Sequence, residues 1–172
     1  MQIIEMFLKE LDNEAQTTRK FLKLVPNDKF DWQSHPKSMT MLRLATHIAE
    51  LPEWVSLAVT TDELDFAKNP PKQEVINNNE ELLAYFEKNF DEGREHLWAS
   101  NETLLAENWT LRNGDAVYLT STKAELVRVA LNQTTHHRAQ LGVYLRLLNI
   151  PIPGSYGPSA DEQEFELMEQ GQ

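Results

Sequence analysis

The sequence contains no cysteine among its 172 residues. This absence excludes disulfide bonds, thiolate metal ligands and a thiol nucleophile supplied by the chain itself. Any metal ion bound by this protein must therefore be held by histidine, carboxylate, amide or water ligands.

Positive charge is also scarce, because 16 lysine and arginine residues are outnumbered by 27 aspartate and glutamate residues, for a formal net charge of -11. Such a field repels phosphate backbones, so we expect no nucleic-acid partner. No apolar run approaches the roughly 20 residues that cross a bilayer, and we expect no membrane partner. The N-terminal residues lack the basic start and apolar core of a signal peptide, which makes the cytoplasm the expected compartment.

Apolar residues recur at helical spacing in four stretches, residues 2–24, 41–60, 80–99 and 123–149. Each stretch has a single apolar stripe that an isolated helix cannot bury. We therefore expect an all-α fold, an antiparallel four-helix bundle with long connectors. The length is that of one domain, so residues 1–172 are expected to form a single unit.

The second helix is marked by three local signals. Ser38 or Thr40 could cap its start with a side-chain oxygen. Pro52 lies inside the helix and cannot donate to the carbonyl of Ile48, so it should kink or split the helix. After the helix, the polar stretch 61–79 contains a double proline and predicts a connector.

Two further signals precede the last long helix. The pair Asn113-Gly114 lies between two short β-prone segments and predicts a hairpin. Thr122 is followed three residues later by Glu125, a capping-box spacing that predicts the start of the helix. Residues 158–172 are acidic and are expected to form a tail or a short terminal helix.

Polar residues interrupt the apolar stripe of the last helix. Steps of three and four residues trace this stripe through Leu126, Ala130, Gln133, His137, Leu141, Tyr144 and Leu148. Gln133 and His137 are therefore expected to face the core, with His136 nearer the edge of the stripe. His47 lies on the apolar side of the second helix. A buried polar group without a hydrogen-bond partner costs roughly 1–3 kcal/mol of stability, so these side chains need either hydrogen bonds or a metal ion. Their spacing is compatible with both.

The segments "LATHIAELPEW" and "LNQTTHHRAQLGVYLRLLNIPIPGSYGPSADE" resemble the DinB family of metal-dependent proteins. The similarity extends to "TTRKFLKLVPNDKFDWQSHPKSMTM" and so covers nearly the whole chain. The resemblance implies a four-helix bundle that is often a homodimer. It also implies a divalent metal, commonly zinc or nickel, held by a histidine of the second helix and a His-x-x-x-His pair of the fourth.

Carried onto this chain, the resemblance assigns metal-ligand positions to His47 and His137 and places Gln133 where the family has its third histidine. An amide oxygen is a weak ligand for zinc or nickel, so we expect the metal to be weakly bound or absent. Three arrangements are compatible with this ligand chemistry. They are a weakened site completed by water, a site rescued by His136 or Glu50, and a set of hydrogen bonds without a metal.

The resemblance also implies a function, because characterised members of the superfamily include transferases and isomerases that use low-molecular-weight thiols. The metal would stabilise the thiolate of a cosubstrate, which is compatible with a chain that has no cysteine. We therefore expect a metal-dependent hydrolase or thiol-dependent transferase relative that acts on a small molecule through a degenerate His-Gln-His site. The alternative is a non-catalytic, small-molecule-binding or stress-associated dimer without bound metal.

The remaining conspicuous residues receive structural interpretations. Arg138 and Arg146 are expected to form ion pairs, and we expect no catalytic role for His35 or His96. Packing in the core or at an interface is expected for the tryptophans, which are Trp32, Trp54, Trp98 and Trp109.

Overall fold

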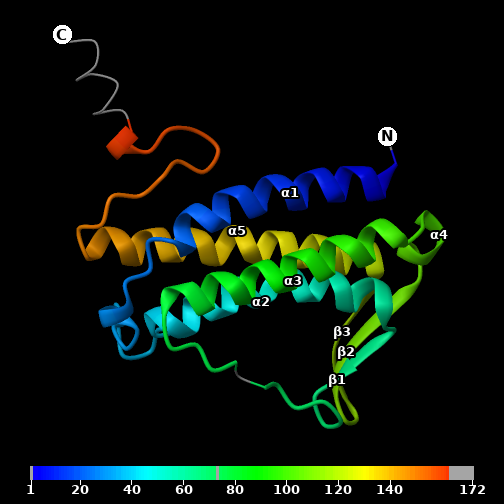
Figure 1. Cartoon of the computed structure of the whole chain (residues 1–172). Coiled ribbons are helices and arrows are strands. Elements are labelled where there is room, and N and C mark those ends of the chain that lie inside the picture. Colours follow the sequence, from blue (N-terminus) through cyan, green and yellow to red (C-terminus); the bar gives the residue numbers. More distant parts are fainter. Residues whose placement is uncertain (1, 73, 163–172) are drawn as a thin grey trace.

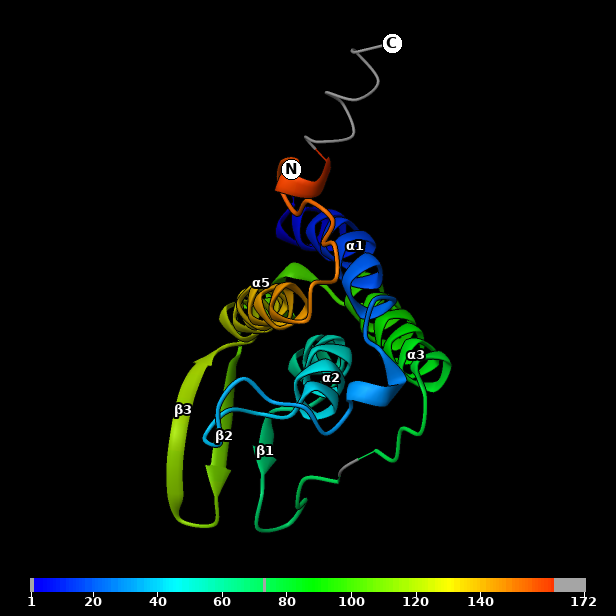
Figure 2. The same ribbon diagram turned by 90° about the vertical axis from the view of Figure 1, so that its left-hand side faces the viewer.

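The computed structural model describes residues 2–72 and 74–162. Its long helices are α1 (Ile3–Leu22), α2 (Met41–Thr60), α3 (Asn79–Ala99) and α5 (Lys123–Leu147). These four helices lie side by side (Figure 1), and α1 and α2 each contact both α3 and α5. Figure 2 looks along the helices and shows how they surround a shared core.

The predicted helix caps are present at the starts of α2 and α5. The side chain of Thr40 accepts a hydrogen bond from the backbone N–H of Arg43, so Thr40 is the cap and Ser38 is not. Thr122 and Glu125 form the complete capping box, in which each side chain bonds to the backbone N–H of the other residue. Both caps satisfy donors that have no partner inside the helix.

Pro52 does not split α2, which continues without a break to Thr60. The carbonyl of Pro52 instead lies against Gly93 of α3, where an added Cβ atom would be only 2.5 Å from the carbonyl oxygen. Glycine therefore allows α3 to approach the backbone of α2 closely at this point.

A small sheet accompanies the helices, so the fold is mostly helical but not strictly all-α as expected. It contains β1 (Glu63–Asp65), β2 (Asn108–Asn113) and β3 (Ala116–Thr122) in the order β1-β2-β3. β2 and β3 form the predicted antiparallel hairpin. The unexpected strand is β1, which pairs in parallel with β2 from within a connector. The chain is thus mostly helical with a three-stranded sheet.

Two short helical turns complete the connections. They are η1 (Asn27–Lys29), between α1 and α2, and α4 (Glu102–Leu105), between α3 and β2. Trp109 of β2 is fully buried and donates a hydrogen bond from Nε1 to Thr61 Oγ1, so it packs in the core as expected. Trp98 is 70% exposed and therefore does not belong to the core.

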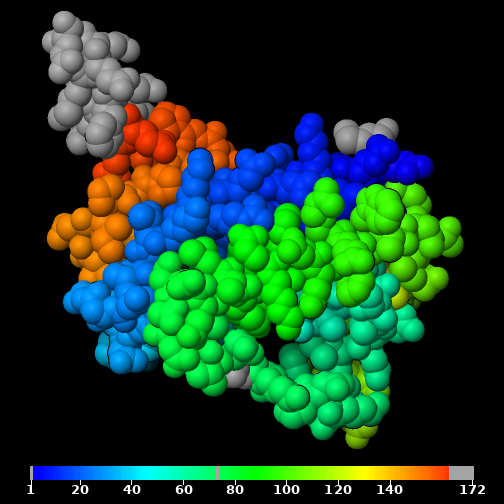
Figure 3. Space-filling model, viewed as in Figure 1, coloured from blue at the N-terminus to red at the C-terminus, as the bar shows by residue number. Residues whose placement is uncertain are grey.

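The segment that follows α5 folds back along the helices. In Figure 3, its orange residues lie against the blue residues of α1. Arg146 of α5 forms a bidentate ion pair with Asp161, with a shortest distance of 2.6 Å from Nη2 to Oδ2, as predicted for this arginine. Residues 163–172, most of the expected acidic tail, lie outside the described residues. Among those that are described, no helix is both long enough and apolar enough to cross a membrane.

Candidate functional site

The buried side of α5 agrees only in part with the stripe expected from the sequence. Leu126, Ala130, Leu141 and Tyr144 are buried as expected. The buried residues outside that stripe include Val127, Leu131, Thr134, Arg138 and Leu145. Gln133 is exposed and His137 is only partly buried, so the expectation that both face the core is wrong for Gln133. The buried side passes through Thr134 and Arg138, two polar residues that a search for apolar periodicity does not include.

Arg138 is 1% exposed and forms a polar network between α1 and α5. Its Nη1 lies 2.6 Å from Glu14 Oε2 and donates to Thr18 Oγ1 at 3.1 Å. Its Nη2 donates to the hydroxyl of Tyr156 at 3.1 Å, and that hydroxyl donates to Glu14 Oε1 at 2.9 Å. The predicted structural ion pair is therefore confirmed, with a partner on another helix.

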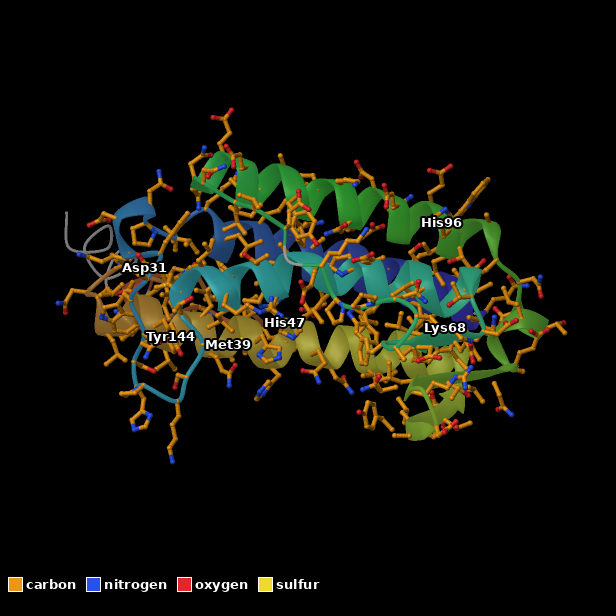
Figure 4. The ribbon with its side chains drawn as sticks, turned by 90° about the horizontal axis from the view of Figure 1, so that it is seen from below. Asp31, Met39, His47, Lys68, His96 and Tyr144 are labelled. Carbon is orange, nitrogen blue, oxygen red and sulfur yellow. The ribbon has the colours of Figure 1, made fainter. Side chains whose placement is uncertain are left out.

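His47 of α2 and His137 of α5 lie next to each other. Their ring centroids are 4.5 Å apart, and the ring planes are inclined by 72°. The centroid of the exposed His136 ring lies 4.8 Å from that of His137. Figure 4 looks at this side of the molecule and labels His47, which lies in the first half of α2. The fold thus brings together the two histidines to which the family resemblance assigned metal-ligand positions.

Each of these two rings also contacts an acceptor three residues further along its own helix. Nδ1 of His47 lies 2.5 Å from Glu50 Oε1, and Nδ1 of His137 lies 2.8 Å from Gln140 Oε1. A carboxylate or amide oxygen can only accept a hydrogen bond, so both contacts place the proton on Nδ1. In each neutral ring, Nε2 then keeps the lone pair with which imidazole binds a metal.

Burial and hydrogen bonds shift the pKa of two groups at this site, Glu50 and His137. Burial raises the pKa of Glu50, but hydrogen bonds from His47 and Arg43 outweigh burial and hold this pKa below its ordinary value. Burial lowers the pKa of His137, although its hydrogen bond to Gln140 opposes this effect. Glu50 is therefore a carboxylate and His137 a neutral imidazole at neutral pH.

The donor atoms present fit a borderline divalent ion only in part. Imidazole suits zinc and nickel, and two imidazoles are available. No group of three or more histidine, aspartate or glutamate side chains is arranged to hold a metal within residues 2–72 and 74–162. Gln133 instead lines a hollow of about 440 Å³ on α5 together with Val129, Asn132 and His136. His47 and His137 could thus supply two ligands, with water or a small molecule in the other positions.

From the sequence, Glu50 was considered only as a metal ligand, and Gln140 was not identified as a hydrogen-bond partner of His137. A signal for both was present, because Glu50 follows His47 by three residues and Gln140 follows His137 by the same spacing. Side chains three residues apart are neighbours on a helix. The other two histidines make different contacts, since His96 Nδ1 pairs with Ser56 Oγ at 2.6 Å and His35 Nδ1 accepts from the backbone of Lys37.

Comparison with known proteins gives the same architecture. The uncharacterized protein YrdA of Bacillus subtilis is 19% identical over 162 residues, which cover 94% of this chain and 92% of that protein. The crystal structure of the DinB-like protein YjoA from Bacillus subtilis has a TM-score of 0.69 at 14% identity, covering 87% of this chain and 96% of its own. The crystal structure of a DinB-like protein from Bacillus cereus has a TM-score of 0.68 at 20% identity, and the match covers 88% of this chain and 97% of that protein.

These structural similarities concern the fold alone. The family itself is identified by its sequence pattern, which matches residues 1–171 of this protein. The chain belongs to the DinB family.

Proposed function

We propose that this protein is a relative of metal-dependent DinB transferases and hydrolases in which His47 and His137 bind a divalent ion, zinc or nickel, weakly. The observation that supports this proposal is the contact between the two imidazoles, whose centroids are 4.5 Å apart although they belong to different helices. We take the four long helices as the four-helix bundle that holds these ligands in the family.

A bound divalent ion would stabilise the thiolate of a low-molecular-weight thiol at neutral pH. The residues of the chain would hold the ion and orient the substrate. His47 and His137 would be the ligands, each with its Nδ1–H bonded to an acceptor of its own helix. Gln133, which lines the hollow on α5, would orient a small-molecule substrate.

The test is titration of metal-free, untagged protein with nickel and zinc by calorimetry. We expect one ion per chain with modest affinity, and loss of binding in both His47→Ala and His137→Ala. His35→Ala is the matched control, because His35 lies in the connector before α2 and should leave binding unchanged. Absence of binding in the wild-type protein, or equal loss in the control, would contradict the proposed site.

Catalysis is tested by consumption of thiol in the presence of a panel of electrophiles. Under the proposed function, consumption depends on added nickel or zinc and disappears in His137→Ala. If thiol consumption is the same with and without metal across the panel, the transferase activity is excluded for those substrates.

A second candidate is a non-catalytic protein that binds a small molecule and has lost turnover. It is favoured by the exposed position of Gln133, which has replaced an imidazole of the family pattern. The variant Gln133→His distinguishes the two functions. A gain of tight, stoichiometric metal binding together with thiol turnover would support the enzyme relative, whereas metal binding without turnover would support the second candidate.

We further propose that the partner of this chain is a second copy of itself. From residue 129 to residue 145, no exposed side chain of α5 is an aspartate, glutamate, lysine or arginine, and Val129 and Val143 are exposed. In a chain with a net charge of -11, such a surface lets two copies approach with little repulsion. Analytical ultracentrifugation should show a dimer that Val143→Asp dissociates and that Val75→Asp, on the connector before α3, does not.

A further inference from the structure

The carboxylate of Glu50 connects two other side chains of α2. Its Oε1 lies 2.5 Å from Nδ1 of His47 and accepts a hydrogen bond from Nη2 of Arg43 at 3.2 Å. The side chains of Glu50 and His47 are only 21% and 22% exposed, so water has limited access to the contact between them. Charge-assisted hydrogen bonds are shorter and stronger than neutral ones, and partial burial strengthens them further.

This arrangement determines which nitrogen of His47 is available. A carboxylate accepts and never donates, so the neutral ring must carry its proton on Nδ1 and leave the lone pair on Nε2. We propose that Glu50 is a positioning residue that fixes His47 in this ring form and orientation, with Arg43 holding the carboxylate in place. Glu50 would then act through His47, and would not be a metal ligand itself.

The helix accounts for the alignment of the three side chains. Arg43, His47 and Glu50 follow one another by four and three residues, which places them on one side of α2. Arg43 donates its hydrogen bond to Glu50, so the arginine would influence the imidazole of His47 through the carboxylate.

The two histidines are therefore not equivalent. His137 has a neutral amide as its acceptor, which polarises an imidazole less than a carboxylate does. His47 would be the stronger of the two donors, and removal of Glu50 should reduce metal affinity more than removal of Gln140. The effect on affinity depends on the proposed metal site, whereas the ring form of His47 does not.

The first experiment examines the metal-free protein by ¹⁵N NMR of the histidine side chains. We expect His47 to be protonated at Nδ1 in the wild type and to become a mixture of both neutral forms in Glu50→Ala. Glu50→Gln retains an acceptor oxygen and should lie between the two. Glu53→Ala is the matched control, an exposed glutamate three residues further along α2. An unchanged ring form in Glu50→Ala would overturn the positioning role.

The second experiment measures nickel affinity by calorimetry. Loss of a hydrogen-bond partner of a ligating histidine typically weakens binding by about 10- to 100-fold, and we expect this loss in Glu50→Ala. Arg43→Ala should weaken binding less, with partial recovery in Arg43→Lys. If the wild type binds nickel and Glu50→Ala binds it equally well, the positioning role is wrong. If the wild type binds no ion but the NMR change occurs, the metal site fails while the positioning of His47 is supported.

Discussion

Arg138 is the residue whose removal should be most costly to stability. Its guanidinium lies within 2.6 Å of the buried carboxylate of Glu14, and substitution by methionine would leave that carboxylate without a countercharge. Breaking a buried ion pair from one side typically costs about 3–5 kcal/mol. We expect Arg138→Met to lower the free energy of unfolding by this amount, measured by urea denaturation.

The matched control is Arg94, which pairs with Asp12 on the surface between α3 and α1. Both of these side chains are exposed, and exposed pairs contribute about 0–1 kcal/mol. If Arg94→Met and Arg138→Met destabilise the protein equally, burial of the Arg138 network is not the reason for its importance.

The ion pair of Asp161 should contribute to stability in a way that depends on pH. Its hydrogen bonds to Arg146 and to the backbone N–H of Ile152 lower its pKa from 3.8 to about 2. Because the folded-state pKa is depressed, the stabilisation is complete above pH 3.8 and is lost as the pH falls through about 2. Carboxyl NMR titration should give a midpoint near 2 in the wild type and a value closer to 3.8 in Arg146→Met. Equal midpoints would show that the arginine does not cause the shift.

At the scale of elements, the approach of α3 to α2 depends on Gly93. A Cβ atom there would lie 2.5 Å from the carbonyl oxygen of Pro52, which is backbone and cannot rotate away. Overpacking of this kind typically costs about 1–3 kcal/mol, so we expect Gly93→Ala to lower the free energy of unfolding by that amount. Gly157→Ala is the comparison, since its Cβ atom would meet no described atom within 4 Å. Similar losses for both variants would contradict the close packing of the two helices.

Local sequence signals predicted most of the helical elements. α2 begins and ends at the residues expected, and the caps at Thr40 and Thr122 are present. Such signals involve side chains and backbone groups within four residues of each other, so they can be recognised without knowledge of the fold. β1 was not predicted because it has only three residues and pairs with β2, more than 40 residues away.

For the whole molecule, a ligand that binds only the folded state must stabilise it. Under the proposed function, nickel at 100 times its dissociation constant should increase the free energy of unfolding by about 2.7 kcal/mol. The melting temperature of the wild type should therefore rise with nickel concentration, while that of His47→Ala should not. The same rise in His47→Ala would place the binding elsewhere on the chain.

The candidate site was predictable only in part. The family pattern led to His47 and His137, and the fold places their rings in contact. The orientation of Gln133 was predicted wrongly, because the apolar stripe on α5 was traced through it and not through Arg138. An arginine is rarely buried without a partner, and its partner Glu14 lies on α1, 124 residues earlier.

The sequence by itself determined the four long helices, their caps, the hairpin and the lack of any thiol chemistry of the chain's own, since each depends on residue type or on neighbours within a few residues. Only the tertiary structure decided which side of α5 is buried, that β1 joins β2, and that His47 meets His137 beside Glu50. These features depend on groups far apart in the chain, whose burial and pairing arise when the helices pack.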